Sequence, residues 1–235
     1  MIYNLQFTID EFLNENKSTL DKLTKFMLEY NRHTNLTRII EHDEIVEKHY
    51  IDSILPLTLY NVPRGTSCLD VGSGAGFPGI PMKMFCPSLQ MTLLDCAKKR
   101  TDYLKALLLE IGVDCEVVTG RSEELSHNPA YRERYGLVTA RAVANLAALC
   151  EYCLAFVKPP AGSEPGGIFL AMKGESCESA GAEKAVEALG GRIVDVIRYE
   201  LPGGDKRSLV VIEKVRQTPT EYPRKRVNIT KTPMV

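Results

Sequence analysis

A short apolar run that ends in an acid and passes directly into a glycine-rich turn constrains this chain more than any other feature. Residues 67–79 read Ser-Cys-Leu-Asp-Val-Gly-Ser-Gly-Ala-Gly-Phe-Pro-Gly. Glycine tolerates positive φ and lets the backbone approach a ligand, and the first such turn of a doubly wound α/β fold forms the nucleotide crevice. We therefore expect a strand, a turn and an adenosine-containing molecule bound at that turn.

The spacing of the glycines distinguishes two kinds of site. A dinucleotide fingerprint, G-x-G-x-x-G, fails when counted from Gly72 because its sixth position is Phe77. Counted from Gly74 it fits, but it then begins four residues after Asp70. The segment agrees better with acidic-x-G-x-G-x-G and so resembles the first motif of S-adenosylmethionine (AdoMet)-dependent methyltransferases. The matching residues are Asp70, Gly72, Gly74 and Gly76. An ordinary tight strand-to-helix turn is the alternative.

A second acid follows at the distance that a ribose site requires. Residues 90–95 form another apolar run, and its last residue, Asp95, lies 19 residues beyond Gly76. An acid about 20 residues after the glycine loop, at the tip of the adjacent strand, can accept hydrogen bonds from ribose hydroxyls. Asp95 could instead cap the amphipathic helix that follows it. We favour ribose binding because of the glycine loop upstream.

The order of apolar runs predicts an α/β fold. Residues 8–60 show helical spacing, and strands alternate with helices from about residue 66. Strands are expected to end at Asp70 and Asp95 and to span residues 115–119, 137–140, 168–172, 192–200 and 208–213, the last two forming a hairpin. This order gives a seven-stranded, mostly parallel sheet with one antiparallel strand, typical of Rossmann-like class I methyltransferases.

Length and composition fit one compact unit. At 235 residues and 44% hydrophobic, the chain can bury one α/β core with an extension. We divide it into an N-terminal helical extension, 1–65, and a methyltransferase domain, 66–235, that ends in a basic tail. Within the extension, Thr8-Ile-Asp-Glu11 resembles a capping box. A helix carrying His49 is expected to break at Pro56.

The remaining composition favours a cytoplasmic protein without a metal. The seven cysteines are odd in number and scattered, which indicates reduced thiols. Cys150 and Cys153 form a single C-x-x-C without a second pair, on what reads as one helix face, so we expect no metal site. The N-terminus lacks the pattern of a signal peptide, and no window reaches the apolar length of a membrane span. We expect no membrane contact and a monomer.

Several segments together resemble one family, the bacterial 16S ribosomal RNA guanine-N7 methyltransferases of the glucose-inhibited division protein B family. Phe77-Pro-Gly-Ile-Pro after the glycines and Ala140-Arg-Ala-Val-Ala after the fourth strand are the most distinctive. The other matching segments are Asn35-Leu-Thr, His49-Tyr-Ile-Asp-Ser, Leu94-Asp-Cys-Ala-Lys-Lys-Arg, Gly120-Arg-Ser-Glu-Glu, Lys173-Gly and Tyr222-Pro-Arg-Lys. The tail after Lys225 departs from the family, and the loop at residues 158–167 is long.

The resemblance implies particular site residues. Its cofactor contacts fall on Gly72, Phe77, Ser122, Glu123 and Arg141. Ser122 and Glu123 follow the third strand, where their backbone N–H groups can meet the ring nitrogens of adenine. Phe77 could pack on the cofactor or on the core.

Two further side chains are candidates for the chemistry. Arg141 ends the fourth strand, where a guanidinium can position a base or a phosphate through two parallel bonds, or form a surface ion pair. His49 is a candidate general base, or a structural residue that hydrogen-bonds within its helix.

The expected reaction is methyl transfer from AdoMet to a guanine of 16S ribosomal RNA, either naked or in the assembled small subunit. Guanine N7 has a free lone pair and no proton to lose, so alignment matters more than a base. The net charge is −1, but residues 214–235 carry a net charge of +5. We expect Arg224, Lys225 and Arg226 to contact RNA phosphates. The alternatives are a methyltransferase for another RNA or a small molecule, a nicotinamide oxidoreductase, and a non-catalytic RNA-binding module.

Overall fold

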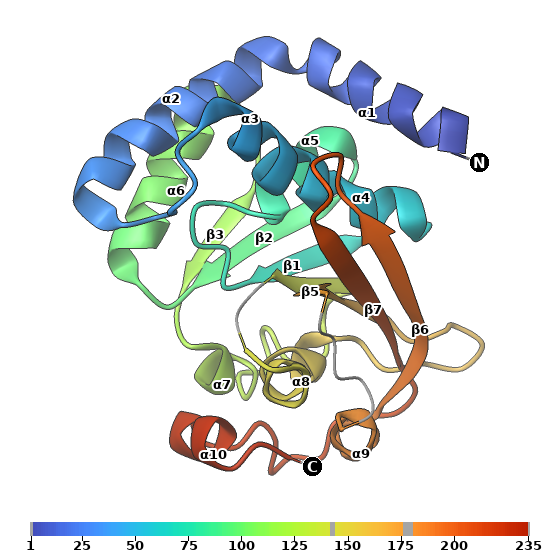
Figure 1. Cartoon of the computed structure of the whole chain (residues 1–235). Coiled ribbons are helices and arrows are strands. Elements are labelled where there is room, and N and C mark those ends of the chain that lie inside the picture. The colour runs from blue at the N-terminus through green and yellow to red at the C-terminus, as the bar shows by residue number, and fades with distance from the viewer. Residues whose placement is uncertain (1, 142–143, 176–180, 235) are drawn as a thin grey trace.

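The computed structural model describes residues 2–141, 144–175 and 181–234 and has a seven-stranded sheet at its centre (Figure 1). Ala142 and Val143 of the family motif, and Cys177, lie outside the described residues. The strands are β1 (Ser67–Val71), β2 (Gln90–Asp95), β3 (Glu116–Thr119), β4 (Leu137–Arg141), β5 (Ile168–Gly174), β6 (Gly191–Glu200) and β7 (Lys206–Lys214). Their order in the sheet is β3-β2-β1-β4-β5-β7-β6.

The predicted mixed sheet is confirmed, and its reversed strand is β7. This strand pairs antiparallel with both β5 and β6, whereas β1 to β5 pair in parallel. The chain winds from β1 outward to β3 and then returns to place β4 on the other side of β1. A crevice opens at such a switch point, beyond the carboxyl ends of the strands. The topology therefore directs the glycine-rich turn after β1 into that crevice.

Helices cover both faces of the sheet (Figure 1). One face is covered by α1 (Ile2–Glu15), α2 (Lys17–Thr34), α3 (His42–Ile45), a π-helical turn (Val46–Ile51), α4 (Asp52–Leu59), α5 (Gly79–Phe85) and α6 (Lys98–Ile111). The other is covered by α7 (Ser122–Leu125), α8 (Leu146–Cys153), a 3₁₀ turn (Leu154–Phe156), α9 (Glu183–Ala188) and α10 (Arg226–Lys231). Successive side chains of a strand point to opposite faces. Phe169 and Leu170 of β5 accordingly belong to different core clusters.

The N-terminal helices pack on the first of these clusters. Leu20, Leu23 and Met27 of α2 are buried in it, as their helical spacing predicts. Two local predictions were wrong. Helix α1 begins at Ile2, so Thr8 lies inside the helix and not at its N-terminus. Helix α4 continues through Pro56 to Leu59. Proline removes one helical hydrogen bond, but Pro56 is itself buried, and tertiary packing overrides such local costs.

The β1–α5 connection is held by a buried acid. The Asp70 carboxylate is fully buried, and its Oδ2 accepts a hydrogen bond from the Gly79 N–H at 3.0 Å. Between them, Gly72 and Gly76 adopt φ values of 78° and 100°, a region that side chains rarely tolerate. A Cβ on Gly79 would lie 2.4 Å from Cδ2 of Leu93 and 2.9 Å from Oδ2 of Asp70. The backbone of α5 can approach β1 this closely only because residue 79 is glycine.

We therefore expect Gly79→Ala to lower the free energy of unfolding by about 1–3 kcal/mol, because the added methyl overpacks the contact between Asp70 and Leu93. Urea unfolding measures the change. Gly174→Ala is the matched control, since a Cβ there meets nothing within 4 Å. Equal stability of the two variants would contradict the close approach.

Candidate cofactor site

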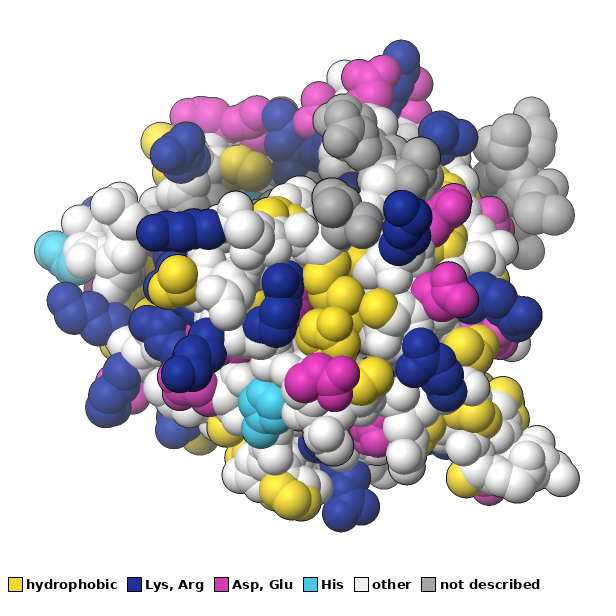
Figure 2. Space-filling view, turned by 90° about the horizontal axis from the view of Figure 1, so that it is seen from below, with side chains coloured by type: hydrophobic (Ala, Val, Ile, Leu, Met, Phe, Trp, Pro, Cys, Tyr) yellow, Lys and Arg dark blue, Asp and Glu magenta, His cyan; other side chains and the backbone are white. Residues whose placement is uncertain are grey.

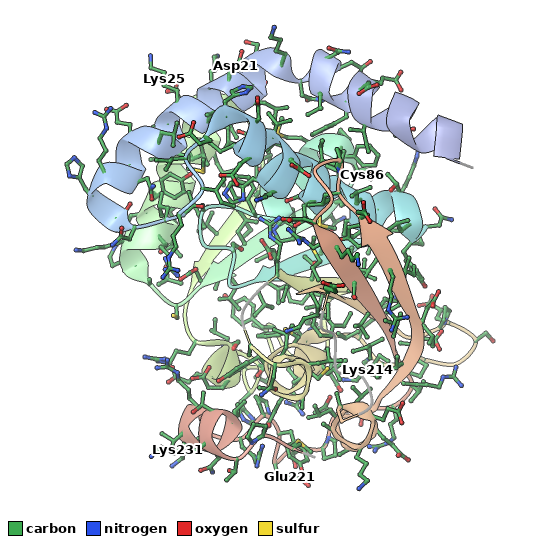
Figure 3. All side chains as sticks on the ribbon, viewed as in Figure 1. Asp21, Lys25, Cys86, Lys214, Glu221 and Lys231 are labelled. Atoms are coloured by element: carbon green, nitrogen blue, oxygen red, sulfur yellow. The ribbon has the colours of Figure 1, made fainter. Side chains whose placement is uncertain are left out.

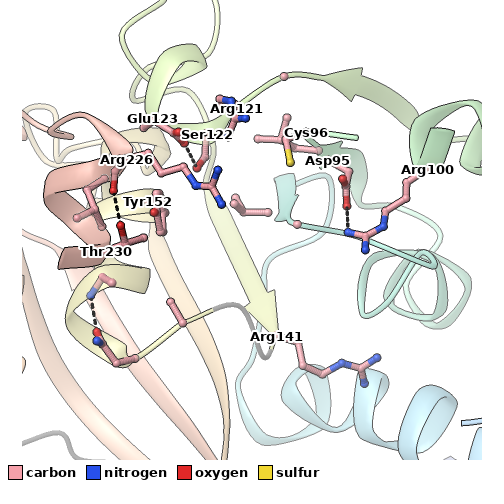
Figure 4. Close-up of a pocket in the computed structure, with 18 residues that line it drawn as sticks. Asp95, Cys96, Arg100, Arg121, Ser122, Glu123, Arg141, Tyr152, Arg226 and Thr230 are labelled. Carbon is pink, nitrogen blue, oxygen red and sulfur yellow. Dashed lines mark hydrogen bonds and ion pairs between the residues drawn. The ribbon is translucent and has the colours of Figure 1, made fainter. Parts of the chain in front are cut away.

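A cavity of about 500 Å³ opens beyond the carboxyl ends of β1 to β4 (Figure 4). Its lining includes five of the residues predicted for the cofactor, which come from four separate strand ends. They are Gly72 after β1, Asp95 at the end of β2, Ser122 and Glu123 after β3, and Arg141 at the end of β4. Residues of α8 and α10 complete the lining. The structure thus brings together side chains that are spread over 70 positions of the sequence.

The other predicted cofactor residues are not part of this lining. Asp70, Gly74, Gly76 and Phe77 are absent from the cavity wall in the described part of the chain. Oδ1 of Asp70 has no hydrogen-bond partner among the described residues, and burial raises the pKa of Asp70 to about 6. Asp70 therefore supports the glycine loop from below rather than facing the cavity.

Asp95 connects the glycine loop to the start of α6 and lies at the cavity. Its carboxylate is 3% exposed and lines the cavity. Oδ1 accepts the N–H of Ala97 at 2.9 Å, at the start of α6, and Oδ2 accepts the N–H of Gly74 at 3.0 Å. Nη1 of Arg100 lies 3.6 Å from Oδ2. Each carboxylate oxygen can accept a second hydrogen bond, so Asp95 fastens the glycine loop to α6 and can still accept a hydroxyl.

Ser122 and Glu123 begin α7, directly after the turn that leaves β3. The first N–H groups of a helix have no acceptor within the helix, so at this position they suit an acceptor in the cavity. The Glu123 carboxylate receives the Ser122 hydroxyl at 3.4 Å and lies 3.9 Å from the Arg121 guanidinium. The backbone of this turn therefore suits the edge of a ring that carries nitrogen acceptors.

Arg141 is fixed by residues of the N-terminal extension. Its Nη1 donates to the Lys48 carbonyl at 3.0 Å, to Oδ2 of Asp52 at 3.2 Å and to the Ser53 hydroxyl at 3.3 Å. Burial lowers the pKa of the guanidinium, and the Asp52 carboxylate opposes that shift. Its ion pair is thus not the surface pair that was the alternative, because the Asp52 side chain is 4% exposed.

Asp52 is a functional candidate that sequence reasoning did not select. Besides holding Arg141, its Oδ1 accepts the Tyr199 hydroxyl at 3.2 Å and lies 3.6 Å from Nε of Arg207. It thereby joins the extension to β4 and to the β6–β7 hairpin. The available signal was the segment His49-Tyr-Ile-Asp-Ser, which places Asp52 one helical turn after His49.

His49 packs as a neutral, buried side chain. Its ring stacks on Phe77 with centroids 4.4 Å apart and an interplanar angle of 8°. Nε2 lies 3.0 Å from the Thr37 hydroxyl. Burial and the nearby charge of Arg141 lower the pKa of His49 to about 3. The Arg141 guanidinium lies 5.7 Å from the centroid of the Phe77 ring, so Phe77 packs against both His49 and Arg141.

The predicted basic tail does not form a single exposed strip. Lys214 is buried and donates to the Leu154 carbonyl, and Figure 3 shows it inside the ribbon while Lys231 lies at the edge. Arg224 pairs with Glu151 of α8 at 2.7 Å. Lys225 is exposed, and Arg226 lines the cofactor cavity. Only the fold could reveal these positions, because local charge says nothing about distant partners.

The cysteines and acidic side chains outside the cavity form no further candidate site in the described part of the chain. Within the described ranges, no group of three or more His, Cys, Asp or Glu side chains could hold a metal ion. Cys150 and Cys153 are reduced and buried on α8. None of the helices described is both long and apolar enough to span a bilayer.

The His49 pKa predicts a pH dependence of stability. An unfolded histidine binds a proton near pH 6.5, whereas folded His49 does so only near pH 3, so its contribution is present above pH 6.5 and is lost as the pH falls toward 3. Between about pH 7 and about pH 4, we expect the free energy of unfolding to fall less in His49→Gln than in the wild type, by on the order of 3 kcal/mol. Urea unfolding at both pH values tests this, with His33→Gln, an exposed histidine of α2, as the control. Parallel declines in the wild type and His49→Gln would contradict it.

Comparisons with known proteins agree with this geometry. The family model GidB, described as rRNA small subunit methyltransferase G, matches residues 16–199. The ribosomal RNA small subunit methyltransferase G of Acetivibrio thermocellus is 43% identical over 228 residues, covering 94% of this chain and 91% of that protein. The protein of the same name from Lactobacillus acidophilus is 41% identical, covering 91% and 89%.

Among solved structures, a SAM-dependent methyltransferase from Aquifex aeolicus superposes with a TM-score of 0.57 at 16% identity, covering 77% of this chain and 98% of that one. This likeness confirms the class I methyltransferase fold. The match over residues 16–199, together with relatives above 40% identity along most of their length, shows that the chain belongs to the GidB family of small-subunit ribosomal RNA methyltransferases.

Proposed function

We propose that this protein transfers a methyl group from AdoMet to N7 of a guanine in 16S ribosomal RNA. The observation that carries the proposal is the single cavity onto which Gly72, Asp95, Ser122, Glu123 and Arg141 converge, in a chain of this family. We further propose that it acts as a monomer in the cytoplasm, on RNA of the small ribosomal subunit.

The residues present fit AdoMet. Asp95 offers free carboxylate lone pairs to the donor hydroxyls of a ribose, and the turn at Ser122 offers N–H groups to the acceptor nitrogens of adenine. Leu94 and Ala148 supply apolar wall between them. When bound, AdoMet supplies an electrophilic methyl group on a sulfonium sulfur. The chain's task is then to orient that group and to present the base.

The proposed chemistry depends on alignment. Guanine N7 attacks with a lone pair that carries no proton, so the enzyme needs to fix the reacting atoms in line and to tolerate a positive charge on the ring. Arg141 lines the cavity and is preorganised by Asp52, which suits it to hold a base edge or a phosphate. It acts by position, because a guanidinium stays protonated at physiological pH.

Exposed cations around the cavity are the proposed contacts for RNA. Arg100 and Arg121 line it with side chains 41% and 44% exposed, and Lys225 is exposed nearby, at the start of α10. Figure 2 shows Lys and Arg side chains gathered toward one side of the face that it presents. Neutralising phosphates with such side chains gives salt-dependent binding even at a net charge of −1. Arg224 already donates Nε–H and Nη2–H to Glu151, so fewer of its N–H groups face a phosphate than those of Lys225 or Arg121.

Methyl transfer from tritiated AdoMet tests the proposal. We expect label in 16S ribosomal RNA at a single guanine, in a form that sensitises the strand to cleavage at N7-methylguanine, and no label from Arg141→Ala above a small fraction of the wild-type rate. Comparing naked RNA with assembled subunits identifies the substrate form. Label in another RNA or on another atom would replace this function with that of a different methyltransferase.

The acceptor atom also predicts a pH profile. Because N7 has no proton to lose and the pKa of His49 is about 3, the single-turnover rate should be nearly flat from about pH 6 to about pH 9. His49→Gln should leave the profile flat, and Arg141→Ala should lower the rate throughout. A rising limb near pH 6.5 that disappears in His49→Gln would indicate a general base and an acceptor with a proton to lose.

A further inference from the structure

The C-terminal segment is bound to the methyltransferase domain at several points before it reaches α10. The Arg132 guanidinium donates to the carbonyls of Thr218 and Tyr222 at 2.8 and 3.0 Å. The His127 ring nitrogen lies 2.9 Å from the Pro223 carbonyl. These contacts involve backbone oxygens, so they fix the path of the chain and do not depend on its side chains.

A buried ion pair then fastens the start of α10 to α8. Glu151 of α8 is fully buried, and its Oε1 accepts both the backbone N–H and the Nε–H of Arg224 at 2.8 Å. Its Oε2 accepts Nη2–H of Arg224 at 2.7 Å, and the same nitrogen donates to the Thr232 carbonyl beyond the helix. A buried carboxylate is costly unless paired, and a fork of parallel bonds fixes its partner's orientation. Arg224 thus holds both ends of α10.

This placement puts α10 in the wall of the cofactor cavity. Arg226, Ile229 and Thr230 line the cavity, and Figure 4 shows Arg226 on the same side as Ser122 and Glu123. Figure 4 shows the Arg226 side chain extending from α10 toward the middle of the cavity, beside Tyr152. Lys225, the neighbouring cation, is not among the residues that line this cavity in the described part of the chain.

We propose that Arg226 is a donor-binding residue that covers the adenine ring of AdoMet, and that the Glu151–Arg224 ion pair positions it there. The inference rests on the proposed function, since it names a further residue of the same site. A guanidinium is flat, weakly hydrated and attracted to aromatic faces, so it suits an adenine ring held at the Ser122 turn. This proposal gives Arg226 a role in binding the methyl donor, in place of the phosphate contact expected from the sequence.

Calorimetry without RNA tests the assignment. We expect Arg226→Ala to weaken AdoMet by about 5- to 30-fold, the range for a partly desolvated cation–π contact. Methylthioadenosine, which keeps the adenosyl part and lacks the amino acid part, should lose the same factor. Lys225→Ala is the matched control, and it should bind both ligands within about twofold of the wild type while reducing the salt dependence of RNA binding.

The positioning role of Arg224 needs a readout that general destabilisation would not give. Arg224→Ala should also weaken AdoMet, and the double variant with Arg226→Ala should bind little worse than Arg226→Ala alone, because Arg224 acts through Arg226. Additive losses would overturn the positioning role.

Arg226→Ala involves an exposed residue, so this variant should fold even if Arg224→Ala does not. AdoMet affinity within twofold of the wild type in Arg226→Ala would overturn the assignment of Arg226. If the wild type itself bound no AdoMet, the proposed function would fail instead.

Discussion

The hydrogen bond from the Gly79 N–H to the Asp70 carboxylate sets the geometry on which the site depends. It closes the β1–α5 connection, and with that closure the intervening glycines adopt left-handed conformations that bring the backbone to the cavity edge. The acid is fully buried, and its pKa of about 6 reflects the cost of that burial. Because burying this carboxylate costs desolvation free energy, Asp70 adds little to the stability of the fold, and its main effect is to fix the conformation of the glycine loop. Asp95 continues the same arrangement by binding Gly74 from the next strand.

Two ion pairs with buried carboxylates attach the N-terminal and C-terminal segments to the core of the domain. Asp52 holds Arg141 and thereby attaches the N-terminal extension to β4. Glu151 holds Arg224 and thereby attaches the C-terminal segment to α8. Buried pairs add little net stability, because desolvation offsets their attraction, but they tolerate few alternative geometries. Arg141 lines the cavity, and Arg224 lies two residues before Arg226, which also lines it, so both segments are fixed where they can complete the site.

The sheet and much of the site could be predicted because their signals are local. Apolar runs ending in Asp70 and Asp95 place two strand ends, and parallel strands bring their carboxyl ends to one edge, so Gly72, Asp95 and Arg141 had to meet. The errors came where tertiary packing decides. Pro56 lies inside a helix because its packing in the core outweighs the lost hydrogen bond. Arg224 is one of the cations of the basic tail. Its ion-pair partner, Glu151, lies 73 residues earlier, on a helix with an apolar pattern. No local pattern encodes that pairing.

The titratable groups around the cavity favour a reaction without proton transfer. His49 is neutral across the physiological range, because burial and Arg141 both oppose its protonation, and it stacks on Phe77 behind the cavity. Asp70 is enclosed beneath the loop, and each oxygen of Asp95 already accepts a backbone N–H. Arg141 remains charged and is fixed by Asp52. A site built from oriented acceptors and a fixed cation can align a nucleophile that brings its own lone pair, but it would serve poorly for one that must first lose a proton.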